Sequence, residues 1–107
     1  MIKDLDPADL QQFLAQSGSG VTVVDVRTPA EVARGGIRGA RPIPLHVLPL
    51  SASTLDKDAP LVFYCQSGGR SSQACVFLQQ QGYKNLHNLR GGIVAWARAG
   101  LPVEPVE

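Results

Sequence analysis

The sequence contains little of what several common classes of protein need. Among 107 residues there are two cysteines and two histidines, and two cysteines are too few for the disulfide framework of a small secreted protein. No Cys-x-x-Cys pair occurs, and His46 and His87 stand alone, so we expect no metal ion. Each histidine is expected to be solvated or locally hydrogen-bonded rather than a ligand or a catalytic base.

An excess of one charge and a long apolar run are also absent. Ten basic residues against nine acidic ones leave a net charge of +1, which argues against nucleic acid or an anionic membrane as a partner. The longest apolar run, residues 61–65, is far too short to cross a bilayer. The N-terminus also lacks the layout of a signal peptide, so we expect a soluble protein of the cytoplasm.

What is present is the composition of an ordinary globular domain. Hydrophobic residues make up 44% of the chain and charged residues 18%, and a chain of this length can bury one core without disulfides. The sequence shows no internal repeat, linker or second domain. We therefore predict a single domain over residues 1–107.

Helical and extended patterns alternate along the chain. The first half predicts a helix from residue 7 to a turn at 17–20, a strand at 21–26, a short helix after a capping box at 28–31, a strand at 40–45 and a weak helix at 46–55. The second half predicts a strand at 61–64, a helix capped by Ser71 or Ser72, a strand at 85–89, and a helix after residue 92 with Ile93, Trp96 and Ala97 inward. This alternation predicts an α/β fold whose parallel sheet is covered on both faces.

The loop after the strand at 61–64 carries the strongest indication of chemistry. Ligands of parallel sheets bind at the carboxyl ends of strands, and here Cys65 is followed by a glycine-containing turn and a helix. Gly68 and Gly69 allow backbone N–H groups to turn inward as an anion-binding nest, and Arg70 adds positive charge. We expect this setting to lower the pKa of Cys65 and favour its nucleophilic thiolate. The alternative is a buried cysteine before an ordinary turn.

Four segments of the chain resemble the rhodanese family of sulfurtransferases. Residues 65–71, Cys-Gln-Ser-Gly-Gly-Arg-Ser, resemble the active-site loop of the family. Residues 24–31 and 36–44 are similar to its N-terminal segments, and residues 89–96 to its C-terminal signature. The resemblance covers nearly the whole chain in order. It implies a three-layer α/β fold with a mostly parallel five-stranded sheet flanked by helices.

The resemblance also implies a reaction. The Cys65 thiolate would attack the outer sulfur of an anionic donor such as thiosulfate, carry it as a persulfide, and pass it to cyanide, a small thiol or a thioredoxin-like protein. This covalent chemistry needs no metal or organic cofactor. The expected catalytic residue is Cys65, and the expected substrate-binding residues are those of the loop: Gln66, Ser67, Gly68, Gly69, Arg70 and Ser71.

Two other functions fit the same loop. A cysteine phosphatase or arsenate reductase would use five residues between cysteine and arginine, whereas four separate Cys65 from Arg70, so this alternative ranks lower. A non-enzymatic persulfide carrier or sulfide-sensing module shares the loop with a transferase and stays open. Thiosulfate sulfurtransferase activity is the leading hypothesis.

Several residues outside the loop carry weaker expectations. Gly36 stands where many members of the family have histidine, which puts the local packing in question. The family reading makes Arg27 and Glu31 partners that hold one corner, and Asp25 could border the pocket. Cys75 is expected to be a small buried residue rather than a resolving thiol.

Overall fold

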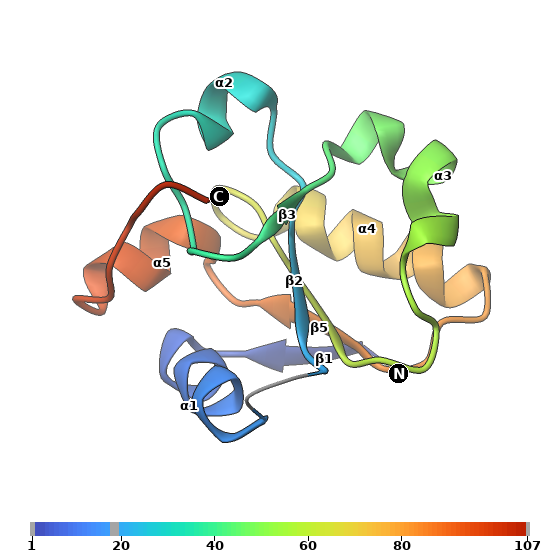
Figure 1. The fold of residues 1–107 in the computed structure, drawn as a ribbon, viewed down its shortest axis with the longest axis horizontal. Helices are drawn as coiled ribbons and strands as arrows, with labels where there is room; N and C mark the ends of the chain where they lie inside the picture. The colour runs from blue at the N-terminus through green and yellow to red at the C-terminus, as the bar shows by residue number, and fades with distance from the viewer. Residues whose placement is uncertain (1, 18–19, 107) are drawn as a thin grey trace.

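Within residues 2–17 and 20–106, which the computed structural model describes, five parallel strands form one sheet (Figure 1). In the order in which they lie side by side, the strands are β1 (Ile2–Leu5), β5 (Leu86–Leu89), β4 (Leu61–Tyr64), β2 (Thr22–Asp25) and β3 (Arg41–Pro42). The predicted α/β fold with a five-stranded parallel sheet is confirmed.

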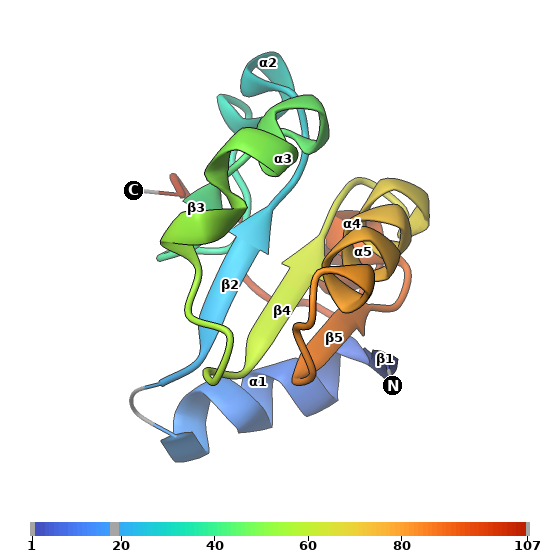
Figure 2. The same cartoon turned by 90° about the vertical axis from the view of Figure 1, so that its right-hand side faces the viewer.

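Helices cover both faces of this sheet (Figure 2). They are α1 (Pro7–Ser17), α2 (Pro29–Val32), α3 (Leu48–Ser51), α4 (Gly69–Gln80) and α5 (Gly92–Arg98), with 3-10 turns at Leu45–Val47 and Ala52–Thr54 beside α3. One buried cluster joins the sheet to α3 and α4, and a second joins it to α1 and α5. The arrangement therefore has three layers. In the part of the chain that the structure describes, no helix is long and apolar enough to cross a membrane.

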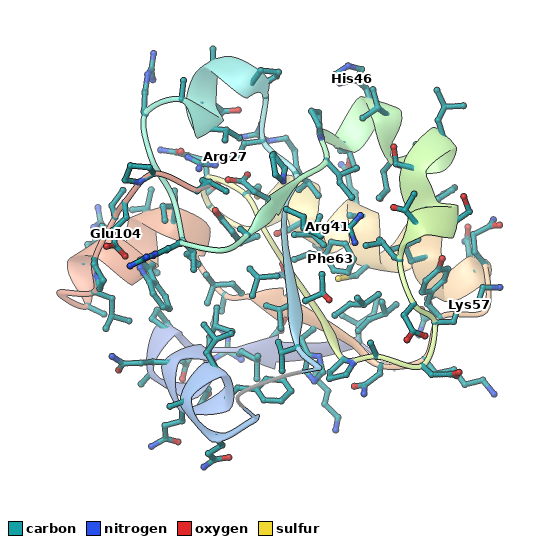
Figure 3. The ribbon with its side chains drawn as sticks, viewed as in Figure 1. Arg27, Arg41, His46, Lys57, Phe63 and Glu104 are labelled. Atoms are coloured by element: carbon teal, nitrogen blue, oxygen red, sulfur yellow. The ribbon has the colours of Figure 1, made fainter. Side chains whose placement is uncertain are left out.

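The central strand β4 determines which face Cys65 belongs to. All four residues of β4 are buried. Because side chains alternate along a strand, Leu61 and Phe63 pack in the α4 cluster, whereas Val62 and Tyr64 pack in the opposite one. Phe63 lies near the middle of the molecule (Figure 3). Cys65 continues the alternation into the α4 cluster, beside the helix that begins at Gly69.

The predicted strands are present, the one at 61–64 with its predicted bounds and the others shorter, and one strand is additional. The strand predicted at 40–45 is reduced to Arg41–Pro42 because proline cannot donate to a sheet ladder. The strand β1 was not predicted, since two of its four residues, Lys3 and Asp4, are charged and exposed. It becomes a strand by pairing with β5 along its whole length.

Helix α2 begins as predicted, whereas α4 does not. The Thr28 side chain accepts a hydrogen bond from the backbone N–H of Glu31, and the Glu31 carboxylate accepts one from the backbone N–H of Thr28. The predicted capping of α4 by Ser71 or Ser72 is wrong. The helix begins at Gly69, and the preceding residue has a φ of +114°, which favours glycine.

Three smaller predictions have mixed outcomes. The weak helix predicted at 46–55 forms as α3 between two 3-10 turns. In α5, Ile93 and Trp96 are buried as predicted, but Ala97 is exposed. Of the turn predicted at 17–20, residues 18 and 19 lie outside the described residues.

Candidate active site

The Cys65 sulfur lies where backbone N–H groups converge. Cys65 follows the last residue of β4 and is 1% exposed. Its Sγ accepts hydrogen bonds from the backbone N–H of Gly68 at 3.1 Å and of Ser71 at 3.5 Å. The Ser71 hydroxyl lies 3.5 Å from the same sulfur. These donors come from the first turn of α4, where helical N–H groups have no partner within the helix. The geometry suits a negatively charged sulfur.

The pKa of Cys65 lies below its ordinary value. Burial is the largest single influence and raises the pKa, because it disfavours the charged form. The Ser71 side chain and the backbone N–H groups of Ser71, Gly68 and Ser67 act in the opposite direction, and together they outweigh burial. The lowered pKa predicted from the sequence is therefore confirmed in direction.

The first residues of α5 hold the other side of the loop. The backbone N–H of Ile93 donates to the carbonyl of Cys65 at 2.9 Å, and that of Val94 donates to the carbonyl of Gln66 at 3.2 Å. These bonds occupy the carbonyls at the start of the loop. Gly92 has a φ of +60°, and a Cβ there would lie 2.4 Å from the Cys65 carbonyl oxygen. The double glycine before α5 could have indicated this contact, because it permits a close approach of two backbones.

Ser71 links the loop to the neighbouring strand β5. Its hydroxyl is buried and lies within hydrogen-bond distance of the Asn88 side-chain oxygen, the Gly68 carbonyl and the Cys65 sulfur. A hydroxyl has one hydrogen to donate, so these three acceptors compete for it. Asn88 was missed by the sequence analysis, because it enters the site through strand pairing rather than through a motif.

Arg70 is held by Glu31 in a two-fold ion pair. Its Nη1 donates to Oε1 of Glu31 at 2.6 Å and its Nη2 donates to Oε2 at 2.8 Å. The predicted partnership of Arg27 with Glu31 is therefore wrong. As the third residue of α2, Glu31 also accepts the capping hydrogen bond, which fixes its carboxylate at the start of the helix that follows β2.

Arg27 pairs instead with Asp25, the last residue of β2. Its Nε donates to both carboxylate oxygens and its Nη2 donates to Oδ2 at 2.7 Å. Asp25 is fully buried. Burial is the largest influence on Arg27 and lowers its pKa, but the hydrogen bonds and the charge of Asp25 outweigh it, so the pKa of Arg27 is raised. A compensated buried pair of this kind fixes a corner of the fold rather than offering free charge to a ligand.

The structure explains why glycine is suitable at position 36. A Cβ there would lie 2.5 Å from the Tyr64 hydroxyl oxygen and 2.7 Å from Nη2 of Arg27. The backbone of Gly36 also exchanges two hydrogen bonds with Glu104 in the C-terminal segment. In this chain Tyr64 and Arg27 therefore occupy the space into which a histidine side chain would have to extend.

Two clefts flank the Arg70–Glu31 pair. One of about 250 Å³ is lined in part by Glu31, Arg34 and Gln66. The other, of about 280 Å³, is lined in part by Arg70 and His46. A more apolar groove of about 510 Å³ runs between α2 and the C-terminal segment, and no loop residue lines it. The two smaller clefts are therefore the approaches to the loop.

The remaining candidates are structural. Cys75 is fully buried, its sulfur donates to the carbonyl of His87, and burial raises its pKa to about 12. The ring Nδ1 of His87 lies 3.2 Å from the Leu61 carbonyl oxygen. His46 is exposed and points outward (Figure 3). Over residues 2–17 and 20–106, no three His, Cys, Asp or Glu side chains are grouped to hold a metal ion.

Comparison with known proteins identifies the family. The family model for the rhodanese-like domain matches residues 6–99. The chain belongs to the rhodanese family. Relatives cover almost its full length, among them a protein of Allochromatium vinosum named "Sulfurtransferase", which is 50% identical over 103 residues, or 96% of this chain and 95% of the relative.

Two further relatives agree with this assignment. The "Thiosulfate sulfurtransferase GlpE" of Ectopseudomonas mendocina is 34% identical over 98% of this chain and 93% of its own length. The crystal structure of a rhodanese-related protein from Thermoplasma volcanium superposes with a TM-score of 0.86 at 33% identity, covering 96% of this chain and 98% of that one. Family and relatives together support sulfurtransferase activity as the general function.

Proposed function

We propose that this rhodanese transfers sulfane sulfur from an anionic donor such as thiosulfate to a thiophilic acceptor through a persulfide on Cys65. The observation that carries the proposal is the convergence of N–H groups from Gly68 and Ser71 on the Cys65 sulfur. Hydrogen-bond donors fixed around a sulfur stabilise a thiolate and, equally, the terminal sulfur of a persulfide.

The reaction proceeds in two displacements at sulfur. In the first, the Cys65 thiolate forms a bond to the outer sulfur of thiosulfate, and the electron pair of the broken S–S bond leaves with sulfite. In the second, the acceptor attacks the outer sulfur of the persulfide and restores the Cys65 thiolate. Cyanide then leaves as thiocyanate, and a thiolate leaves as a persulfide. No redox cofactor takes part, because each step passes the sulfur atom from a leaving group to a nucleophile: an S–S bond breaks, and an S–S bond or, with cyanide, a C–S bond forms.

The position of Arg70 favours sulfur transfer over phosphate chemistry. A cysteine phosphatase needs its arginine to surround a bound tetrahedral oxyanion. Here both terminal nitrogens of Arg70 are engaged by Glu31, and only four residues lie between Cys65 and Arg70. The loop is therefore better suited to one additional sulfur atom on Cys65 than to a phosphate group. The acceptors we propose are cyanide, a small thiol or a thioredoxin-like protein.

Intact-mass measurement after incubation with thiosulfate tests the proposal. The wild-type protein should gain the mass of one sulfur atom, which dithiothreitol removes and cyanide converts to thiocyanate. The Cys65→Ser variant should gain none, and the matched Cys75→Ser variant should behave as wild type. A sulfur adduct that peptide mapping places on Cys75, or no adduct with any sulfane donor, contradicts the proposal.

A further inference from the structure

The positive charge of the loop is already neutralised inside the protein. The Arg70 guanidinium and the Glu31 carboxylate meet through two parallel hydrogen bonds, and their side chains are 35% and 23% exposed. Two-fold contacts of this type are the strongest that arginine makes with a carboxylate. An anion that reaches Arg70 therefore meets a paired arginine rather than a free one.

Glu31 is fixed in place by its own helix. Its Oε1 accepts hydrogen bonds from the backbone N–H of Thr28 at 3.0 Å and from the Thr28 hydroxyl at 3.1 Å. The hydrogen bond from Arg70 is the largest cause that lowers the pKa of Glu31, to about 2, and the backbone hydrogen bond from Thr28 is the next. The carboxylate is therefore ionised throughout the neutral range.

The charged residues around the loop influence how strongly an anionic donor is attracted. Two other arginines lie near the site: Arg27 is compensated by Asp25, and Arg34 lines the same cleft as Glu31. The pKa of Arg70 is raised mainly by its hydrogen bond to Glu31, with a smaller contribution from the charge of Cys65. Arg70 also directly precedes Ser71, whose backbone N–H donates to the Cys65 sulfur, so it lies near any charge at the sulfur, and Glu31 offsets its attraction for an incoming anion.

We infer that Glu31 is a specificity-determining residue, which pairs with Arg70 and so disfavours doubly charged sulfur donors relative to singly charged ones. This inference rests on the proposed function and specifies its donor class. Thiosulfate carries two negative charges, whereas an organic thiosulfonate or an alkyl persulfide carries one. The penalty from a fixed carboxylate scales with the charge of the donor. Glu31 therefore reduces the advantage that Arg70 would otherwise give a doubly charged donor over a singly charged one.

Both classes of donor react by the same step. With thiosulfate, the Cys65 thiolate bonds to the outer sulfur and sulfite leaves with the electron pair of the broken S–S bond. With methanethiosulfonate, the same attack expels methanesulfinate. The atoms, electrons and total charge balance in each case without an oxidant or reductant. The two donors therefore differ mainly in charge, which makes them a suitable pair of probes.

Replacing Glu31 with glutamine tests the inference. Glutamine keeps the size of the side chain and can serve in a capping box, but it removes the charge. In Glu31→Gln, kcat/KM for thiosulfate should rise roughly three- to tenfold and that for methanethiosulfonate by less than about twofold. The difference should shrink as ionic strength increases. An equal change for both donors overturns the inference.

Three control variants separate charge from structure. Asp58→Asn removes the same charge from an exposed turn before β4, at the opposite end of that strand from Cys65, and should leave the donor ratio unchanged. Thr28→Ala breaks the helix cap without changing charge and should affect both donors alike.

The third control places Glu31→Gln in an Arg70→Met background. There the substitution should still favour thiosulfate, because it still removes the repulsion between the Glu31 carboxylate and the donor. Loss of all donor selectivity in that background would show that Glu31 acts only by positioning Arg70, and would overturn the charge argument.

A second readout does not require sulfur transfer. The rates at which iodoacetate and iodoacetamide alkylate Cys65, followed by peptide mass, compare a charged reagent with a neutral one. In Glu31→Gln the ratio of the iodoacetate rate to the iodoacetamide rate should rise roughly two- to fivefold, and in Asp58→Asn it should not. If neither donor transfers sulfur to the wild type, the proposed function fails and the alkylation ratio alone decides the role of Glu31. An unchanged ratio overturns that role.

Discussion

The two cysteines of this protein share one hydrophobic cluster and differ in chemistry. Cys65 is 1% exposed and Cys75 is fully buried, and both belong to the cluster beneath α3 and α4. Burial raises the pKa of each thiol. It raises that of Cys75 to about 12, whereas hydrogen bonds bring that of Cys65 below its ordinary value. Burial by itself therefore does not decide whether a thiol is reactive.

The difference comes from the position of each cysteine in its element. Cys75 lies in the middle of α4, and its sulfur donates to an acceptor, the carbonyl of His87. Cys65 lies between a strand and a helix, where the first N–H groups of α4 are available to its sulfur. A reactive cysteine needs hydrogen-bond donors that are not already paired with backbone carbonyl groups.

The largest expected effect is the difference in reactivity between the two thiols. Because its pKa is lowered, Cys65 should reach its maximum alkylation rate below the pH at which an ordinary thiol, with a pKa of about 8.5, does so. Cys75 stays protonated until about pH 12. Near neutral pH, iodoacetamide should modify Cys65 at least about 100-fold faster. Peptide mass mapping over a pH series measures both rates, and equal rates for Cys65 and Cys75 would contradict the prediction.

The next largest effect is expected from Gly92→Ala, which disturbs the surroundings of Cys65 and not those of Cys75. Its Cβ would meet the Cys65 carbonyl oxygen at 2.4 Å, at a φ of +60°. Overpacking and left-handed strain together should lower the free energy of unfolding by about 2–5 kcal/mol. Urea denaturation measures this change, and the pKa of Cys65 should rise while that of Cys75 stays the same.

Gly69→Ala is the matched control for this substitution. Gly69 is the first residue of α4, and a Cβ there meets nothing within 4 Å. Alanine should therefore leave the free energy of unfolding unchanged or raise it by about 0.5–1 kcal/mol. If both variants lose the same stability, the close contact between α5 and the loop does not carry the effect.

The smallest effect is expected from Ser71→Ala. Removing one hydroxyl near the Cys65 sulfur should raise the pKa of Cys65 only slightly, because the 3.5 Å contact is long and Asn88 competes for the hydrogen. Ser72→Ala, at an exposed position of the same turn, should leave it unchanged. An unchanged pKa in both variants would show that the Ser71 hydrogen goes to Asn88.

Local patterns in the sequence were sufficient for much of the site. The capping box at Thr28 and the cysteine before a glycine turn each involve residues within a few positions of one another, so their geometry follows from backbone chemistry. The same patterns predicted the parallel sheet and the buried Cys75. They misplaced the start of α4, because the left-handed conformation at Gly68 ends the loop before either serine can cap the helix.

The sequence by itself therefore determined the alternation of strands and helices, the loop that follows Cys65 and the direction of its pKa. The tertiary structure decided which distant groups complete the site. Glu31 and Arg70 are 39 residues apart in the chain, and Asn88 and Ile93 reach the loop from β5 and α5. Strand β1 likewise exists through its pairing with β5. Ion pairs and strand pairings between distant segments depend on how elements meet in space, and periodicity reports only the face that each element presents.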